Sequence, residues 1–236
     1  MHSGDAIEQA STGDANFPRG RSTSLFLLGW GIVAGPFYLA VGIAQGLVRE
    51  GFSFARHPLS VLSNGPGGWV QVANLALTGA MVLAAAAGFR RVLGRQSRAM
   101  SWFLALYGAG MLVAAVFRAD PMDGFPVGTP LGPPTSISTS GIIHFAAGGI
   151  GFVSVAISCF CAARVMSRRH ARALSRLSFM SGLVVMLGFF SVTIPHSSPV
   201  LGIWIAVVVA WVWLAILAQQ VSCLLGSHRG PGSLSA

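Results

Sequence analysis

Long apolar stretches alternate with short polar segments along most of the chain. Each stretch holds about twenty residues, the length that a helix needs to cross the hydrocarbon core of a bilayer. Proline, glycine, serine and charged residues fill the segments between them. The pattern predicts an all-α membrane protein, a six-transmembrane-helix bundle with spans at about 25–48, 69–89, 99–117, 141–163, 177–194 and 200–225.

The two ends of the chain differ from this pattern. Residues 1–24 are rich in glycine, serine and charged residues for most of their length, and such a composition predicts a disordered tail. Residues 226–236 have a similar composition and predict a second short tail. The membrane domain is therefore expected to occupy residues 25–225.

The composition agrees with a protein surrounded by lipid. Hydrophobic residues make up 53% of the 236 residues and charged residues only 9%, and the mean hydropathy is +0.70. Because a soluble domain carries about 25% charged residues, a water-soluble globule is excluded. The cysteines Cys159, Cys161 and Cys223 have no metal-ligand spacing, so we interpret them as small buried hydrophobic residues.

The distribution of arginine predicts the orientation in the membrane. The net charge is +9, and all fifteen basic residues are arginines. Twelve of them lie in the two tails and in the loops after spans two and four. Since cytoplasmic loops carry the excess of basic residues, we expect both termini in the cytoplasm and the protein in the plasma membrane. Nucleic acid is not an expected partner, because these arginines lie in short loops between spans.

This orientation gathers polar residues on the outer face. Three histidines, two aspartates and an arginine lie in or next to the outer loops, where ionisable residues at membrane depth suggest a site. On span two, Gln71, Asn74 and Thr78 are spaced three and four residues apart, so they share one helix face. Unpaired amides in lipid would be costly, and that face should turn into the bundle. The ionisable residues are His57, Arg118, Asp120, Asp123, His144 and His196.

The first interpretation of these residues is structural. Asp120 precedes a proline and Asp123 precedes a glycine, and aspartate in such positions forms turns. Arg118 would form an ion pair with one of the two carboxylates, or extend to the membrane interface. His144 would then donate to a loop carbonyl.

The second interpretation is a metal site. His57, His144 and His196 with Asp120 would supply the imidazoles and carboxylate that catalytic zinc requires. Ser60 or Asp123 would assist a metal-activated water, which gives a hydrolase acting on lipid-like amides or esters. No H-x-x-x-H spacing accompanies these residues. Ser-His-Asp chemistry with Ser60, His144 and Asp120 is a further option, although the chain has no nucleophile-elbow motif.

The third interpretation is a pocket that binds a lipid headgroup or small solute and needs no cofactor. The expected ligand-binding residues are Gln71, Asn74, Arg118, Asp120 and His144, with Gln71 and Asn74 as one wall. Membrane lipids are the expected partners. We therefore expect a membrane protein that binds a lipid headgroup or small solute, with the metal-dependent hydrolase as the alternative.

The order of several short motifs resembles a known family. His57-Pro58-Leu59-Ser60 is followed by Gly68-Trp69-Val70-Gln71, then by Phe117-Arg118-Ala119-Asp120-Pro121 and Gly141-Ile142-Ile143-His144. This order, over about residues 25–225, resembles the membrane family called domain of unknown function 998. The resemblance implies a multi-spanning membrane protein and brings no activity, cofactor or catalytic residue. A more distant likeness is to membrane metal hydrolases of the alkaline ceramidase kind, whose paired histidines at i and i+4 are absent from this chain.

Overall fold

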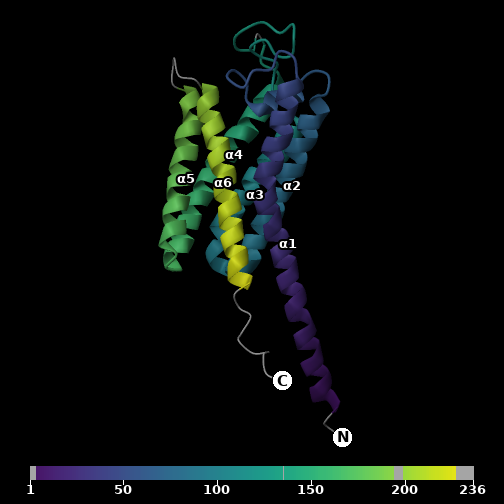
Figure 1. The fold of residues 1–236 in the computed structure, drawn as a ribbon, viewed down its shortest axis with the longest axis vertical. Coiled ribbons are helices and arrows are strands. Elements are labelled where there is room, and N and C mark those ends of the chain that lie inside the picture. Colours follow the sequence, from purple (N-terminus) through teal and green to yellow (C-terminus); the bar gives the residue numbers. More distant parts are fainter. Residues whose placement is uncertain (1–3, 135, 194–198, 227–236) are drawn as a thin grey trace.

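The computed structural model describes residues 4–134, 136–193 and 199–226, and these residues are almost entirely helical (Figure 1). Short 3-10 turns, η1 (Leu59–Ser63), η2 (Gly94–Ser97) and η3 (Ser191–Thr193), lie between longer helices. The α-helices are α1 (Gly4–Val48), α2 (Gly68–Leu93), α3 (Arg98–Val116), α4 (Thr139–Arg168), α5 (Arg172–Phe190) and α6 (Pro199–Gly226).

The helices are long and apolar enough to cross a membrane. Among the described residues, five helical runs qualify: Gly20–Val48, Gly68–Val116, Thr139–Arg168, Arg172–Phe190 and Val200–Leu225. Large apolar side chains such as Phe26, Trp102 and Leu187 are exposed on the outside of the bundle. In water this surface would be unfavourable, whereas lipid accommodates it. The chain is therefore an integral, multi-pass membrane protein.

The run Gly68–Val116 folds back on itself at η2. Gly94 begins this turn with a positive φ of 67°, and Ser97 Oγ donates to the carbonyl oxygens of Phe89 at 3.2 Å and Gly94 at 2.9 Å. Deeper in the bundle, a Cβ on Gly79 would lie 2.8 Å from the Gly108 carbonyl oxygen. The backbones of α2 and α3 thus approach closely as an antiparallel hairpin.

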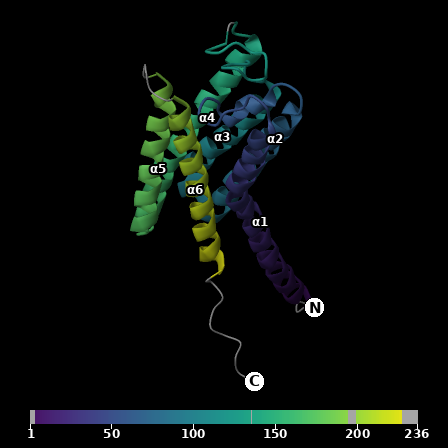
Figure 2. The same ribbon diagram turned by 45° about the horizontal axis from the view of Figure 1, so that its top comes forward.

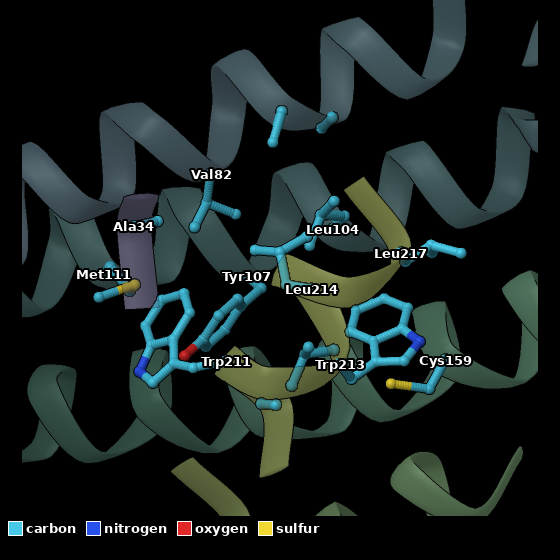
Figure 3. Close-up of a cluster of buried hydrophobic side chains, with 14 of the residues drawn as sticks. Ala34, Val82, Leu104, Tyr107, Met111, Cys159, Trp211, Trp213, Leu214 and Leu217 are labelled. Carbon is cyan, nitrogen blue, oxygen red and sulfur yellow. The ribbon is translucent and has the colours of Figure 1, made fainter. Parts of the chain in front are cut away.

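The six helices form a closed ring. Each packs against its neighbour in the chain, and α6 packs against α1. The core holds Val82 of α2, Leu104 of α3 and Cys159 of α4 against Trp213 and Leu217 of α6, all fully buried (Figure 3). The α1–α6 contact thereby brings the first and last of these helices together and closes the ring.

The helices extend further than the sequence predicted. Helix α1 begins at Gly4, across the stretch predicted as a disordered tail, although the part able to span begins at Gly20. Each residue added to an existing helical turn gains a backbone hydrogen bond without a new nucleation step. Similarly, α2 continues to Leu93 and α4 to Arg168, because arginine favours helix and extends to the interface.

The two ends of the bundle differ in structure. Segments 49–67 and 117–138 lie together at one end, and we call them the cap (Figures 1 and 2). Helix α1 begins and α6 ends at the other end. Most of the arginines lie there, in the two turns that join α2 to α3 and α4 to α5 and in the helix ends beside them, so we call it the arginine-rich end. The candidate site lies under the cap.

Candidate functional site

His57 joins the two segments of the cap. Its side chain is fully buried. The Ser53 N–H donates to His57 Nδ1 at 3.0 Å, so the proton is on Nε2, which donates to the Asp123 carbonyl oxygen at 3.0 Å. The ring lies between Phe52 and Phe125, with centroids 5.3 and 5.7 Å away. Both nitrogens of His57 are therefore used to hold the cap together.

Arg49 and Asn64 add further links within the cap. Arg49 donates to the carbonyl oxygens of Leu62 at 3.4 Å and Asn64 at 2.6 Å, and lies 5.0 Å from the Phe125 ring centroid. Partial burial lowers the pKa of Arg49, which still remains charged at neutral pH. Asn64 Nδ2 donates to the Ala119 carbonyl oxygen at 2.9 Å. Segment 49–67 is thus fixed to segment 117–138 at several points.

Asp120 organises the start of α4. Its carboxylate accepts from the Ser138 N–H at 3.0 Å and from Ser138 Oγ at 2.5 Å. Ser138 Oγ in turn accepts from the Gly141 N–H at 3.0 Å and so caps the helix. A Cβ on Gly141 would overlap the Asp120 carboxylate. Asp120 therefore acts as part of a helix N-cap, where a negative charge is favourable.

The predicted ion pair of Arg118 with Asp120 or Asp123 is not formed between the described residues. Arg118 is exposed, and its carbonyl oxygen accepts from Ser140 Oγ at 2.9 Å. Asp120 is bound by Ser138 instead. Asp123 has a positive φ of 51° and accepts from the Gly132 N–H at 3.2 Å. The turn-forming interpretation describes Asp123, which lies in a turn with a positive φ, whereas Asp120 caps α4 through Ser138.

The polar face of α2 turns into the bundle, as predicted. Gln71, Asn74 and Thr78 are all at least 99% buried. Asn74 Nδ2 donates to the Tyr38 carbonyl oxygen at 3.0 Å and to Gln71 Oε1 at 3.1 Å. Gln71 Nε2 is buried and has no hydrogen-bond partner among the described residues. Asn74 therefore braces α1 against α2, and neither Gln71 nor Asn74 lines the cavity described next.

A cavity of about 150 Å³ lies beneath the cap, between α1, α3, α4 and α6. Its walls are mainly apolar, with Met111, Phe152 and Val207 among them. Gly148 leaves space open beside it, since a Cβ there would meet nothing within 4 Å, whereas a Cβ on Gly110 would lie 2.9 Å from the Ala147 carbonyl oxygen, so Gly110 lets α3 approach α4. Such an apolar recess with a few polar groups is typical of a ligand site.

His144 and Ser60 place polar atoms at the cap side of this cavity. His144 Nδ1 donates to the carbonyl oxygens of Phe117 at 2.8 Å and Ala114 at 3.3 Å, since a carbonyl can only accept. This confirms that His144 donates to a carbonyl near the loop. Its Nε2 is then an acceptor and has no hydrogen-bond partner among the residues that the structure describes.

Aromatic residues form the deep end of the cavity. Tyr38 and Tyr107 line it from α1 and α3. The Trp211 ring of α6 lies against both, with centroids 5.6 Å from Tyr38 and 5.7 Å from Tyr107; Figure 3 shows Trp211 beside Tyr107. The Tyr107 hydroxyl has no hydrogen-bond partner in the described part of the chain. On the α6 side, Trp204 lines the cavity and its buried Nε1 also has none.

The metal-ligand set expected from the sequence is not assembled in the described ranges, 4–134, 136–193 and 199–226. No group of three or more His, Cys, Asp or Glu residues there could hold a metal ion. His57 has both nitrogens bonded to backbone, and Asp120 is bound by Ser138. His196 lies outside the described residues. Of the expected ligands, His144 alone lines the cavity among these described positions.

Two of the expected site residues therefore meet at the cavity, and several others were missed. Ser60 and His144 line it, whereas Gln71, Asn74, Arg118, Asp120 and Asp123 do not. The missed residues are Tyr38, Tyr107, Trp204 and the glycines of α4. The glycines carry a sequence signal, Gly148-Gly149-Ile150-Gly151 in the middle of a span, since glycine there leaves room for a partner or ligand; the aromatic residues carry none.

Comparison with known proteins identifies a family whose function is unknown. A family model described as "Protein of unknown function (DUF998)" matches residues 32–220. No curated protein and no solved structure matches the chain. The matched range contains the whole cap and every residue that lines the cavity.

Proposed function

Since this chain belongs to the DUF998 family of proteins of unknown function, we propose its function from the cavity: it binds an amphipathic lipid or lipid-like solute beneath the cap. The observation that carries this proposal is the arrangement of polar groups. Ser60 and His144 lie at the cap side and Tyr107 at the deep end, with apolar walls between them.

The chemistry of the lining suits a molecule with one polar group and an apolar body. The polar group would receive a hydrogen bond from Ser60 and donate one to His144 Nε2. The apolar body would lie along Met111, Phe152 and Val207, where burial contributes roughly 25 cal/mol per Å² of apolar surface. A highly charged ligand is disfavoured, because no Arg, Asp or Glu is among the described residues that line the cavity.

The proposal includes the topology in the membrane. Helix α3 and helix α5 each have 19 residues, about 28 Å at 1.5 Å per residue, close to the thickness of the hydrocarbon core. Counting α2 and α3 as separate spans gives six, with both termini on one side. The positive-inside rule predicts that the arginine-rich end faces the cytoplasm of a plasma membrane, so the cap and the cavity beneath it belong to the outer side.

The direct test is to identify lipids that co-purify with the protein in mild detergent and to block the cavity by substitution. Gly148→Leu would fill the space, because nothing lies within 4 Å of the new Cβ. Gly29→Leu on α1 is the matched control, since its Cβ also meets nothing within 4 Å but Gly29 does not line the cavity. Mass spectrometry would measure the amount of each lipid per chain.

We expect one lipid species to fall at least tenfold in Gly148→Leu and to stay at the wild-type level in Gly29→Leu. Tyr107→Phe removes one free hydroxyl and should weaken retention of the same species about two- to tenfold, the range for one hydrogen bond. Equal lipid content in the wild type, Gly148→Leu and Gly29→Leu would contradict the proposal.

A further inference from the structure

A second recess lies on the α2–α3 hairpin, at the arginine-rich end of the bundle. It has a volume of about 340 Å³ and opens on the outside of the ring. We call it the hairpin groove. Its lining comes from one side of each helix: Leu83, Ala86, Ala87 and Arg90 of α2, and Arg98, Ser101, Trp102 and Ala105 of α3. Small apolar residues thus form one part of the groove and two arginines the other.

The arginines of the hairpin groove are available for an anion. Arg90 and Arg98 are exposed, and in the described ranges neither has a hydrogen-bond or carboxylate partner. Between residues 20 and 226 the acidic residues are Glu50, Asp120 and Asp123, and all three lie at the capped end. Two guanidinium groups that line one groove favour a phosphate-sized anion, to which arginine donates through parallel N–H groups.

Ser101 provides independent evidence for a ligand. Its side chain is 6% exposed, and its Oγ is buried without a hydrogen-bond partner in the residues described. A buried hydroxyl left unpaired is unfavourable, and a bound oxygen atom in the groove would satisfy it. Ser101 lines the groove between Arg98 and Ala105 on the same helix.

The position of the hairpin groove relative to the membrane selects the class of ligand. Trp102 borders the groove and is 69% exposed, and tryptophan is enriched at the level of lipid headgroups. Arg98 is the first residue of α3, one turn further from the bilayer centre. The alanines lie toward the bilayer centre, where acyl chains are found. A ligand that reaches the arginines, Trp102 and the alanines has a phosphate, a glycerol backbone and an acyl chain at these three depths.

We propose that the hairpin groove binds one anionic phospholipid. Arg90 and Arg98 hold the phosphate, the Ser101 hydroxyl donates to an oxygen of the headgroup or ester, and one acyl chain lies against Leu83, Ala87 and Ala105. This site is separate from the cavity under the cap, which lies at the other end of the bundle, so each proposal can fail without the other.

The test measures lipid binding to purified protein by native mass spectrometry, with phosphatidylglycerol and phosphatidylcholine as probes. The variant Arg90→Gln with Arg98→Gln removes both groove arginines. The matched control, Arg91→Gln with Arg95→Gln, removes the same charge from exposed positions in the same turn that do not line the groove. We expect one phosphatidylglycerol to bind in preference to phosphatidylcholine.

The groove variant should weaken that binding about 10- to 30-fold, since each basic residue near the surface contributes about fivefold. The control should change it less than about threefold. Equal losses in the two variants, or equal binding of both lipids, would overturn the proposal, because the attraction would then be diffuse or absent.

A second variant separates a lipid from a free phosphate. Ala87→Leu fills the apolar part of the groove at an exposed position and leaves the charges unchanged. It should weaken phosphatidylglycerol at least fivefold, while millimolar inorganic phosphate should not displace the lipid from the wild type. Unchanged binding to Ala87→Leu, or displacement by phosphate, would show an anion site without a chain groove and overturn the proposal.

Discussion

His57 and His144 lie at the same end of the bundle. His57 leaves no ring nitrogen available for a ligand, whereas His144 leaves one. His57 uses both nitrogens for backbone hydrogen bonds and is fully buried. His144 uses Nδ1 alone, so its Nε2 remains available beside the cavity. The same residue type thus has two roles: His57 is a structural link in the cap, and His144 is a candidate ligand contact on α4.

Replacing His57 should therefore reduce stability. His57→Ala leaves the Ser53 N–H and the Asp123 carbonyl oxygen without their partner in a buried site, at a cost of about 2–5 kcal/mol. We expect a clearly lower midpoint of thermal unfolding in detergent. A chelator should leave the midpoints of wild type and variant unchanged.

The control for this prediction is His170→Asn. His170 is exposed and has a positive φ of 59°, a conformation that asparagine tolerates. Its unfolding midpoint should match the wild type. If His57→Ala melts like His170→Asn, the structural role assigned to His57 is wrong.

At the scale of single elements, hydropathy indicated where the helices lie, because it is a local property of twenty neighbouring residues. The predicted span 99–117 and helix α3 (Arg98–Val116) differ by one residue at each end. The contacts of the cap were harder to predict, since Asp123 and His57 are 66 residues apart in the sequence. Proximity suggested an ion pair for Asp120, whereas the nearby helix N-cap satisfies it.

The cavity could not be predicted for a related reason. It forms where residues from η1 and from most of the helices meet, and no single helix carries a repeating pattern that marks it. Ser60 and His144 were found because polar residues next to spans are conspicuous. Tyr38 and Tyr107 resemble ordinary core residues, and their role becomes visible only from packing.

Close contact between α2 and α3 gives a prediction at this scale. A Cβ on Gly108 would lie 2.9 Å from the Gly79 carbonyl oxygen, so Gly108→Val should separate the helices and destabilise the protein by about 1–3 kcal/mol. Gly148→Ala is the matched change in an open position of a helix, and there alanine should stabilise by about 0.5–1 kcal/mol. Unfolding in denaturant would measure both, and opposite signs are expected. Equal effects would contradict the close approach of the hairpin.

At the scale of the whole molecule, the ring has a cap at one end and arginines at the other. This asymmetry follows from two physical effects. Arginines hold the turns between α2 and α3 and between α4 and α5 on the cytoplasmic side under the proposed topology. The long segments 49–67 and 117–138 instead satisfy their backbone groups through one another.

Labelling of single cysteines tests this topology. In a background with Cys161→Ser and Cys223→Ser, the remaining Cys159 is fully buried. Leu131→Cys places a thiol in the cap and Gln96→Cys places one in the arginine-rich turn, both at exposed positions. A membrane-impermeant maleimide should label Leu131→Cys in intact cells and Gln96→Cys only after permeabilisation. The reverse order would overturn the orientation.

Closure of the ring by α6 also has a consequence for biosynthesis. Trp211 lies against Tyr38 and Tyr107, and α6 follows the other five helices in the sequence. A nascent chain that has inserted only α1 to α5 lacks the cavity wall formed by Ile203, Trp204 and Val207 and the Trp211 ring behind the two tyrosines. The binding site is thus completed only once α6 has inserted, so ligand occupancy distinguishes a chain that contains α6 from one truncated before it.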